Sequence, residues 1–325
     1  MVTSTPTRTG SETLYRLLDE ELDFSPSFHR IYSSHLAMAL VALEQLGAPP
    51  SRLQAVFDAH AHGGEAERRE DWDLLQVRLE EVHDLGIDAT VRRRVPDLVD
   101  AVGTALFHPV IRLAYGLDVG HEGQVAAALL DWERRAERYV TGPTGDGTRR
   151  LADVAAALSS HPVGTWKRTF DLDGISRRPE LTAALGGVLL DDATLDDVSA
   201  FALAAHATAD DFLTLHLVTG ARAVRAVANV VDEDTARRLA AATVPVMAIA
   251  YAAVGAPRLL DGDHLDELRR HPLPAGEAIA ARAVVARDPH MIKLANVALV
   301  EAARTGDPLY RFLAARVVGL TDPTR

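Results

Sequence analysis

The chain has 325 residues, of which 48% are hydrophobic, and this is enough apolar material for the packed core of one or two domains. The formal net charge of -12 argues against a general nucleic-acid binder and against a binder of anionic membranes, because both need clustered positive charge. The sequence contains no cysteine, which excludes disulfides, thiolate metal ligands and cysteine nucleophiles. We therefore expect a small molecule as the partner.

The hydrophobic residues recur at helical spacing, as in Leu213, His216, Leu217 and Gly220, and strand-like alternation is missing from the sequence. No glycine-rich nucleotide motif follows a predicted strand. We predict an all-α fold, a single large helical domain built as a multi-helix bundle with kinked core helices. The opening segment lacks a targeting signal and the longest apolar run, Val244 to Ala256, is too short to span a bilayer, so we expect no membrane partner and a cytoplasmic protein.

The domain boundaries follow from composition. Residues 1–10 are rich in Ser, Thr and Pro and are predicted to form a disordered tail, with a first helix starting at Ser11. The best candidate for a division further along is Thr141 to Thr148, but this stretch is short and has no low-complexity flank. Residues 11–325 are therefore predicted to form one domain.

The first candidate site lies after Pro26, where apolar residues at helical spacing predict a helix running from Phe28 to the stop at Gly47. His29 and His35 are six positions apart, which turns them to different faces of a straight helix. At most one of them is expected to be a metal ligand. The alternative is one surface histidine and one hydrogen-bonded core histidine.

The second site contains His108 and Pro109 inside a helical pattern, where a proline is expected to kink the helix. Arg112 follows His108 by one turn, on the same face, where its charge could pair with an anionic ligand or with a carboxylate. The alternative is a proline kink beside an ordinary histidine.

Two later sites carry histidines in apolar surroundings. Burying an imidazole without a partner costs about 2 kcal/mol or more, so His216 needs either a hydrogen-bond acceptor or a metal. His290 begins another helix and shares a face with Lys293. A lysine on an apolar stripe either extends its amine to water or stays buried with a lowered pKa, and a neutral amine can take up carbon dioxide as a carbamate.

Other patterns are weaker. The pair Glu80 and His83 has the spacing of a di-iron helix but stands alone, which favours a solvated face. His60 and His62, near a glycine-rich turn, are predicted to be surface residues. The run Arg92 to Arg94 is predicted to be a solvated helix start.

Taken together, four segments of the chain resemble the questin-oxidase-like family. The first runs from Phe28-His29 through His35-Leu36 to Leu46-Gly47-Ala48, and the second, His108-Pro109-Val110-Ile111-Arg112-Leu113-Ala114-Tyr115-Gly116, is similar to that family's His-Pro-Leu-Ile-His-Leu-Gly-Tyr-Gly motif. The others are His216-Leu217-Val218-Thr219 and Asp288-Pro289-His290-Met291-Ile292-Lys293. The four matches occur in the family's order, between about residues 28 and 300.

The resemblance implies an all-helical oxygenase that opens the quinone ring of anthraquinone-type aromatic polyketides with O2, by oxygen insertion or C–C cleavage. It also implies a non-haem Fe(II) centre with a carboxylated lysine. Its metal ligands are expected at His35, His108, His216, His290 and Lys293, with His29 as an alternate. The chain departs from the family at Ile31, Ser34 and Arg112, where the family has further histidines.

The remaining assignments concern the surroundings of this centre. Arg112 is expected to stabilise an anionic phenolate or peroxide, and Tyr115 of the same motif is the second catalytic candidate. Apolar side chains are expected to line a pocket for a flat aromatic substrate; they are Leu36, Ile111, Leu213 and Met291. Two other functions stay open: a metal-free or NADPH-assisted enzyme using His108 and His216 as acid and base, and a non-catalytic helical protein that binds a small molecule.

Overall fold

The computed structural model describes residues 9–28, 32–62, 67–139, 147–162 and 164–321. Within these ranges the chain forms 17 α-helices, two 3-10 turns and one hairpin of two-residue strands, which confirms the predicted all-helical fold. Most of the predicted tail, residues 1–8, lies outside the described residues, and so does most of the candidate division, at 140–146. Among the described residues, no helix has the length and apolar character needed to cross a bilayer.

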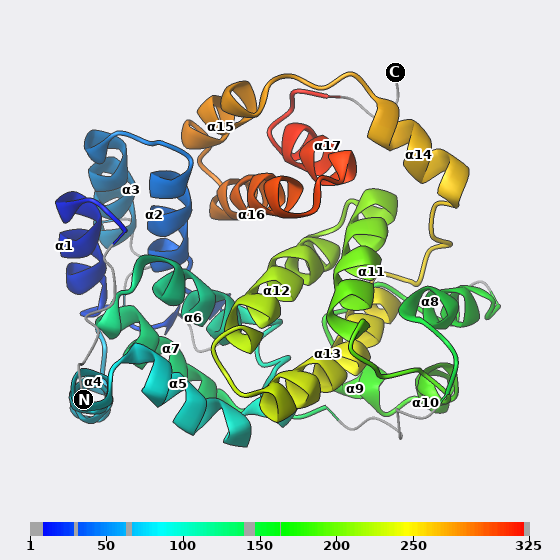
Figure 1. Cartoon of the computed structure of the whole chain (residues 1–325), viewed down its shortest axis with the longest axis horizontal. Helices are drawn as coiled ribbons and strands as arrows, with labels where there is room; N and C mark the ends of the chain where they lie inside the picture. The colour runs from blue at the N-terminus through cyan, green and yellow to red at the C-terminus, as the bar shows by residue number, and fades with distance from the viewer. Residues whose placement is uncertain (1–8, 29–31, 63–66, 140–146, 163, 322–325) are drawn as a thin grey trace.

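The elements fall into three consecutive groups (Figure 1). The first contains α1 (Glu12–Glu21), β1 (Ser27–Phe28), β2 (Tyr32–Ser33), α2 (Leu36–Gln45), α3 (Pro50–His62), α4 (Trp72–Leu85), α5 (Ile87–Arg94), α6 (His108–Val119) and α7 (Glu122–Arg135). The second contains α8 (Leu151–Ser159), α9 (Leu172–Ser176), α10 (Pro179–Leu185), α11 (Thr194–Ala209), α12 (Phe212–Ala228) and α13 (Glu233–Ala253). The third contains α14 (Gly262–Arg270), α15 (Gly276–Val284), α16 (Pro289–Thr305) and α17 (Pro308–Val317).

Four helices from distant parts of the sequence form a closed central group. Helix α2 packs against α6 and α16, and α12 packs against the same two helices; in Figure 1 α2 lies towards the left of the view, and α12 and α16 lie nearer its centre. Their core-facing residues are almost entirely buried, as expected for helices that are apolar on most of their surface. This group positions the candidate site, because each of its helices begins beside one of the four predicted histidines.

Two predicted helix boundaries were wrong. The helix expected from Phe28 begins only at Leu36, because Ser27–Phe28 and Tyr32–Ser33 form two paired antiparallel strands. Pro109 does not kink a helix: it occupies the first turn of α6, where a missing N–H breaks no intrahelical hydrogen bond. A proline does lie within a core helix, at position 245 of α13.

A left-handed turn places the start of α6. The residues Ala105, Leu106 and Phe107 have φ values of 46°, 56° and 69°, a conformation that L-residues adopt at a cost of about 1–2 kcal/mol each. The turn is held from outside, since the backbone N–H of Ala105 donates to Glu137 Oε2 at 2.9 Å. Phe107 then packs on Gly220 of α12, where an added Cβ would lie 2.6 Å from the ring. Such imposed strain is typical of functional sites.

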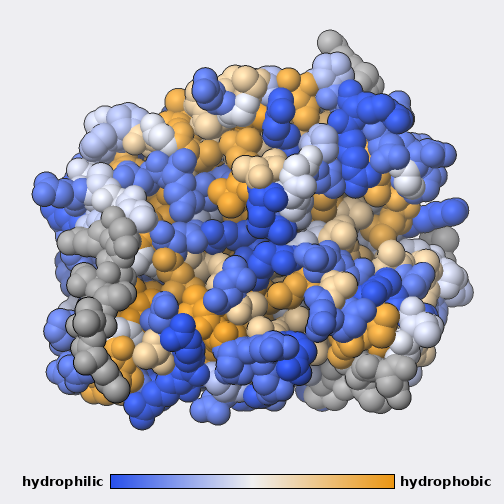
Figure 2. Space-filling model, viewed as in Figure 1, coloured by the Kyte–Doolittle hydropathy of each residue, from blue (hydrophilic) through white to orange (hydrophobic). Residues whose placement is uncertain are grey.

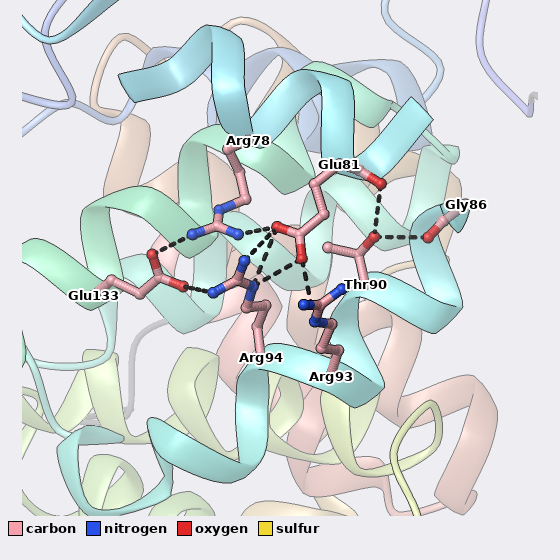
Figure 3. A network of polar contacts seen from close by, with 7 residues as sticks. All are labelled: Arg78, Glu81, Gly86, Thr90, Arg93, Arg94 and Glu133. Carbon is pink, nitrogen blue, oxygen red and sulfur yellow. Dashed lines mark hydrogen bonds and ion pairs between the residues drawn. The ribbon is translucent and has the colours of Figure 1, made fainter. Parts of the chain in front are cut away.

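The predicted solvated helix start at Arg92 to Arg94 is also wrong, since these residues end α5. Arg94 enters a network of ion pairs between α4, α5 and α7, in which the carboxylate of Glu81 is the central acceptor (Figure 3). Arg94 donates to both oxygens of Glu81, and Arg78 bridges Glu81 and Glu133. Partial burial raises the pKa of Glu81, but the hydrogen bonds and charges of Arg94 and Arg78 outweigh it and hold the pKa below 4.5.

We expect Glu81→Gln to lower the free energy of unfolding by about 2 kcal/mol at neutral pH, because it removes the carboxylate that Arg78 and Arg94 share and leaves the nearly buried guanidinium of Arg78 with Glu133 as its remaining acidic partner. A carboxyl with a depressed folded-state pKa stabilises the fold above its unfolded pKa and stops doing so as the pH falls through the folded pKa. The difference from wild type should therefore shrink in acid. Urea unfolding at neutral pH and in acid measures this difference in the free energy of unfolding, with Glu80→Gln at the exposed neighbouring position as the control. Equal stability of both variants would show that the network contributes nothing.

The outer surface is mostly hydrophilic on the face that Figure 2 draws. Figure 2 shows a face dominated by hydrophilic residues, with smaller hydrophobic patches between them. The predicted surface pair Glu80 and His83 is exposed on α4, and His83 lies 3.6 Å from Glu122, so this pair is part of a solvated face.

Candidate metal centre

The candidate centre lies where the N-terminal ends of the four central helices meet. His35 is the N-cap of α2, His108 is the first residue of α6, and His290 lies in the first turn of α16. His216 follows one turn after the start of α12. The N-terminal end of a helix carries partial positive charge, so this junction favours neutral imidazole over protonated imidazolium.

The structure brings the four predicted histidines together. One ring nitrogen from each of His35, His108 and His290 lies within 4.8 Å of the others, close enough to hold one metal ion. The ring of His216 lies behind them, with its centroid 4.9 Å from that of His108 and 5.3 Å from that of His290. Clustering of four imidazoles from four sequence segments is the first feature that distinguishes this site from isolated core histidines.

Hydrogen bonds fix the tautomers of three of these rings. Nδ1 of His108 donates to the carbonyl of Ala105, and Nδ1 of His216 donates to the carbonyl of Phe212 at 2.8 Å. Nδ1 of His290 contacts the carboxylate of Asp288 at 3.0 Å. In each neutral ring the other nitrogen, Nε2, then carries a lone pair.

Those three Nε2 atoms, of His108, His216 and His290, are buried and have no hydrogen-bond partner among the described residues. Burying an acceptor without a partner costs about 1–3 kcal/mol, so three such atoms facing one junction need an explanation. Rings held through Nδ1 by a carbonyl or carboxylate, with Nε2 free, are the usual arrangement of histidine metal ligands. The residues present therefore fit a metal ion.

The electrostatics of the site keep three of the imidazoles neutral, those of His35, His108 and His216. Burial, followed by the charge of Lys293, lowers the pKa of His108 to about 3. Burial and neighbouring charges also hold the pKa values of His35 and His216 well below the ordinary value. Neutral imidazole is the form that binds metals, so these rings are available as ligands at neutral pH.

Lys293 is fully buried and belongs to the same cluster. Its Nζ lies 2.5 Å from Nδ1 of His35, so within the described residues its hydrogen bond goes to an imidazole and not to a carboxylate. Burial lowers the pKa of Lys293 to about 7, only partly opposed by the charge of Asp288. Of the two possibilities for this lysine, the structure excludes an amine extended to water.

A cavity of about 1510 Å³ opens onto the cluster. His35, His108 and His290 form part of its wall. Its apolar lining comes from Leu36, Ala39, Ala55, Val56, Ala59, Leu106, Leu172, Leu213 and Ile292. Two exposed aromatic rings, Phe170 and Phe212, lie at 6.1 Å from each other on the same wall. This lining suits a flat apolar molecule of several rings.

Several residues predicted for the site do not reach the cavity. Arg112 is not among the residues that line it and is buried in an ion pair with Glu21, while its Nε donates to Gln124 at 2.9 Å. Tyr115 is also buried, and its hydroxyl donates to Asn296 at 3.0 Å. Both side chains therefore form hydrogen bonds inside the core. Neither lines the cavity, where their anion-binding and catalytic roles were predicted.

The apolar lining was predicted in part. Leu36 and Leu213 line the cavity, whereas Ile111 and Met291 are not among its walls. His29 and Ile31 lie outside the described residues. At Ser34, where the resembled family has a histidine, the hydroxyl faces the backbone N–H of Leu36 at 3.5 Å.

Other residues of the site were missed. His60, predicted to be a surface residue, lines the cavity, as do Phe212 and Arg135. The Asp-Pro-His sequence at Asp288 is a helix start, so its role in capping α16 and orienting His290 could have been read from the pattern. Nothing in the sequence around Arg135 marks it, because its proximity to His108 arises only from the packing of α6 on α7.

Comparison with known proteins adds no second line of argument for this centre. No protein-family model matches the chain, and no curated protein sequence matches it. The assignment therefore depends on the three orphaned imidazole nitrogens, the buried lysine beside them and the cavity in front of them.

Proposed function

We propose that the chain is a non-haem iron oxygenase that opens the quinone ring of an anthraquinone-type or related aromatic polyketide. The observation that carries this proposal is the set of buried, unpartnered Nε2 atoms of His108, His216 and His290 beside a large apolar cavity. The resemblance of the four histidine segments to questin-oxidase-like proteins supports the choice of reaction.

The donor set supports iron over the hard cations. Imidazole nitrogens suit iron, copper, nickel and zinc, whereas magnesium and calcium prefer oxygen ligands. His108, His216, His290 and His35 would supply the nitrogens, and a carbamate on Lys293 would supply one anionic oxygen. When bound, ferrous iron would supply the electrons that make dioxygen reactive toward the quinone.

The protein's own residues would bind and orient the substrate. The rings of Phe170 and Phe212 offer faces for stacking a polycyclic quinone, and the aliphatic wall excludes water around it. Phe212 also lies against His216 and His290, with ring centroids at 4.5 Å and 4.9 Å. A quinone stacked there would be held beside the histidine cluster.

The alternative acid and base mechanism has less support. A general acid must be protonated at the working pH, and the pKa of His108, lowered by burial to about 3, leaves this ring neutral. His216 is neutral for the same reason. Neither ring is therefore suited to donate a proton at neutral pH.

The test is oxygen consumption by the full chain loaded anaerobically with Fe(II) and supplied with a hydroxyanthraquinone. We expect uptake that depends on the quinone and stops after chelation. C–C cleavage that places both oxygen atoms in the product needs no reductant, whereas insertion of one atom needs two electrons from a donor such as NADPH, so product mass with and without NADPH separates the two. Turnover that survives chelation would favour the metal-free enzyme, and quinone binding without turnover would favour a binding protein.

A further inference from the structure

The wall of the cavity carries four arginines and four carboxylates, and most of them are already engaged. Each carboxylate has a partner within the described residues: Glu137 with the N–H of Ala105, Asp171 with that of Gly174, Asp173 with Arg177, and Asp288 with His290. These acids hold local structure and the orientation of His290. They leave the arginines as the groups available for a ligand.

Three of the arginines are poor candidates for a specific contact. Arg52 donates from Nε to the carbonyl of Val284 at 2.8 Å and from Nη2 to that of Ala286 at 2.5 Å, so it ties α3 to the end of α15. Arg138 and Arg287 are exposed, and a guanidinium in water gains little from pairing with an anion.

Arg135, at the last position of α7, differs from the other three. Its side chain is only 21% exposed. Among the described residues it donates one hydrogen bond, from Nη1 to the neutral hydroxyl of Ser33 at 3.1 Å, and the same Nη1 forms an ion pair with the carboxylate of Asp131 at 3.9 Å, which is too long for a hydrogen bond. A guanidinium has five N–H donors, so Arg135 keeps several of them for a ligand.

The position of Arg135 relates it to the metal cluster. It lines the same cavity as His35, His108 and His290. A largely buried arginine with free donors beside an apolar cavity is an arrangement that can bind a carboxylate or phenolate, since charge-assisted hydrogen bonds strengthen out of water.

We infer that Arg135 is the substrate-positioning residue of this site, and that the substrate is an acidic polycyclic quinone whose ionised phenol or carboxyl pairs with its guanidinium. This inference rests on the proposed function and specifies its substrate class. It takes over the anion-binding role that the sequence assigned to Arg112. The N-terminal ends of the central helices add partial positive charge around the cluster, of the same sign as the guanidinium of Arg135.

The test compares two probes of nearly equal shape, an anthraquinone carboxylate and its neutral carboxamide, by calorimetric titration of the full chain under anaerobic conditions. Wild type is expected to bind the carboxylate about ten- to a hundredfold more tightly than the carboxamide. Arg135→Gln should reduce this ratio to about one, and Arg135→Lys, which keeps the charge, should restore part of it. Because only folded protein binds, the ratio is independent of any loss of folded material.

The matched control is Arg134→Gln, which removes the same charge from the adjacent position. Arg134 pairs with Asp71 on the surface and does not line the cavity, so the carboxylate preference should persist. A preference that survives Arg135→Gln, or no preference in wild type, would overturn the assignment while leaving the metal centre and the quinone reaction intact. Failure of wild type to bind either probe would overturn both the assignment and the quinone substrate. If wild type prefers the carboxylate probe but shows no quinone-dependent oxygen uptake, the proposed oxygenase activity alone would be overturned.

Discussion

Replacement of His108 by alanine is expected to abolish metal binding. Wild-type chain loaded anaerobically with Fe(II) should hold close to one iron, and His108→Ala should lower the affinity by far more than the ten- to a hundredfold that loss of an outer hydrogen bond costs a metal site. Metal content by plasma mass spectrometry measures this directly. Addition of Fe(II) should also raise the melting temperature of wild type, because the ligand binds the folded state, and should leave that of the variant unchanged.

The control for this experiment is His206→Ala. His206 is also buried, and burial lowers its pKa to about 3, but its Nδ1 is hydrogen-bonded to Thr214 Oγ1 at 3.0 Å and it lies outside the cluster. It therefore separates loss of a ligand from loss of any core histidine. Iron retained at wild-type level in His108→Ala, or wild type that takes up no metal after loading, would remove the basis of the proposed centre.

The fold class and the membership of the histidine cluster could both be predicted from the sequence, for different physical reasons. Helical periodicity reports burial directly, so the all-helical fold followed from the spacing of apolar residues. A histidine in an apolar run must find a partner, and this requirement singled out His216 without any knowledge of its neighbours. The same reasoning marked Lys293, which the structure places 2.5 Å from His35.

The predictions that depend on where a helix begins, or on which way a side chain turns, were wrong. Pro109 has the same local sequence whether it interrupts a helix or starts one, and the left-handed turn before it is imposed by Glu137, far along the chain. Arg112 shares a helix with His108, but Glu21 of α1 and Gln124 of α7 turn its guanidinium into the core. Arg135 could not be predicted from the sequence, because tertiary packing alone brings it to the cavity.

The second large effect is expected at Lys293. A neutral amine reacts with carbon dioxide by forming an N–C bond and releasing a proton, which leaves an anionic carbamate. Since burial lowers the pKa of Lys293 to about 7, the reactive amine is scarce below that pH and abundant above it, so carbamate occupancy should rise between about pH 6 and about pH 8. Protein equilibrated with isotopically labelled bicarbonate should show one carbamate carbon by NMR.

The chain offers a clean control for this measurement, because it contains only two lysines, Lys167 and Lys293. Lys167 is exposed, so Lys167→Met should keep both the carbamate signal and the iron. Lys293→Met should lose the signal and most of the iron, together with quinone-dependent oxygen uptake.

Chemical rescue distinguishes a ligand from a packing residue at position 293. In Lys293→Ala, added acetate can place a carboxylate oxygen in the space left by the side chain, so partial recovery of iron binding is expected. A merely structural lysine would be rescued by an apolar filler of similar size, and Lys293→Met would then retain iron. Full iron occupancy in wild type without a carbamate signal would contradict the carboxylated lysine and leave a centre built from imidazoles alone.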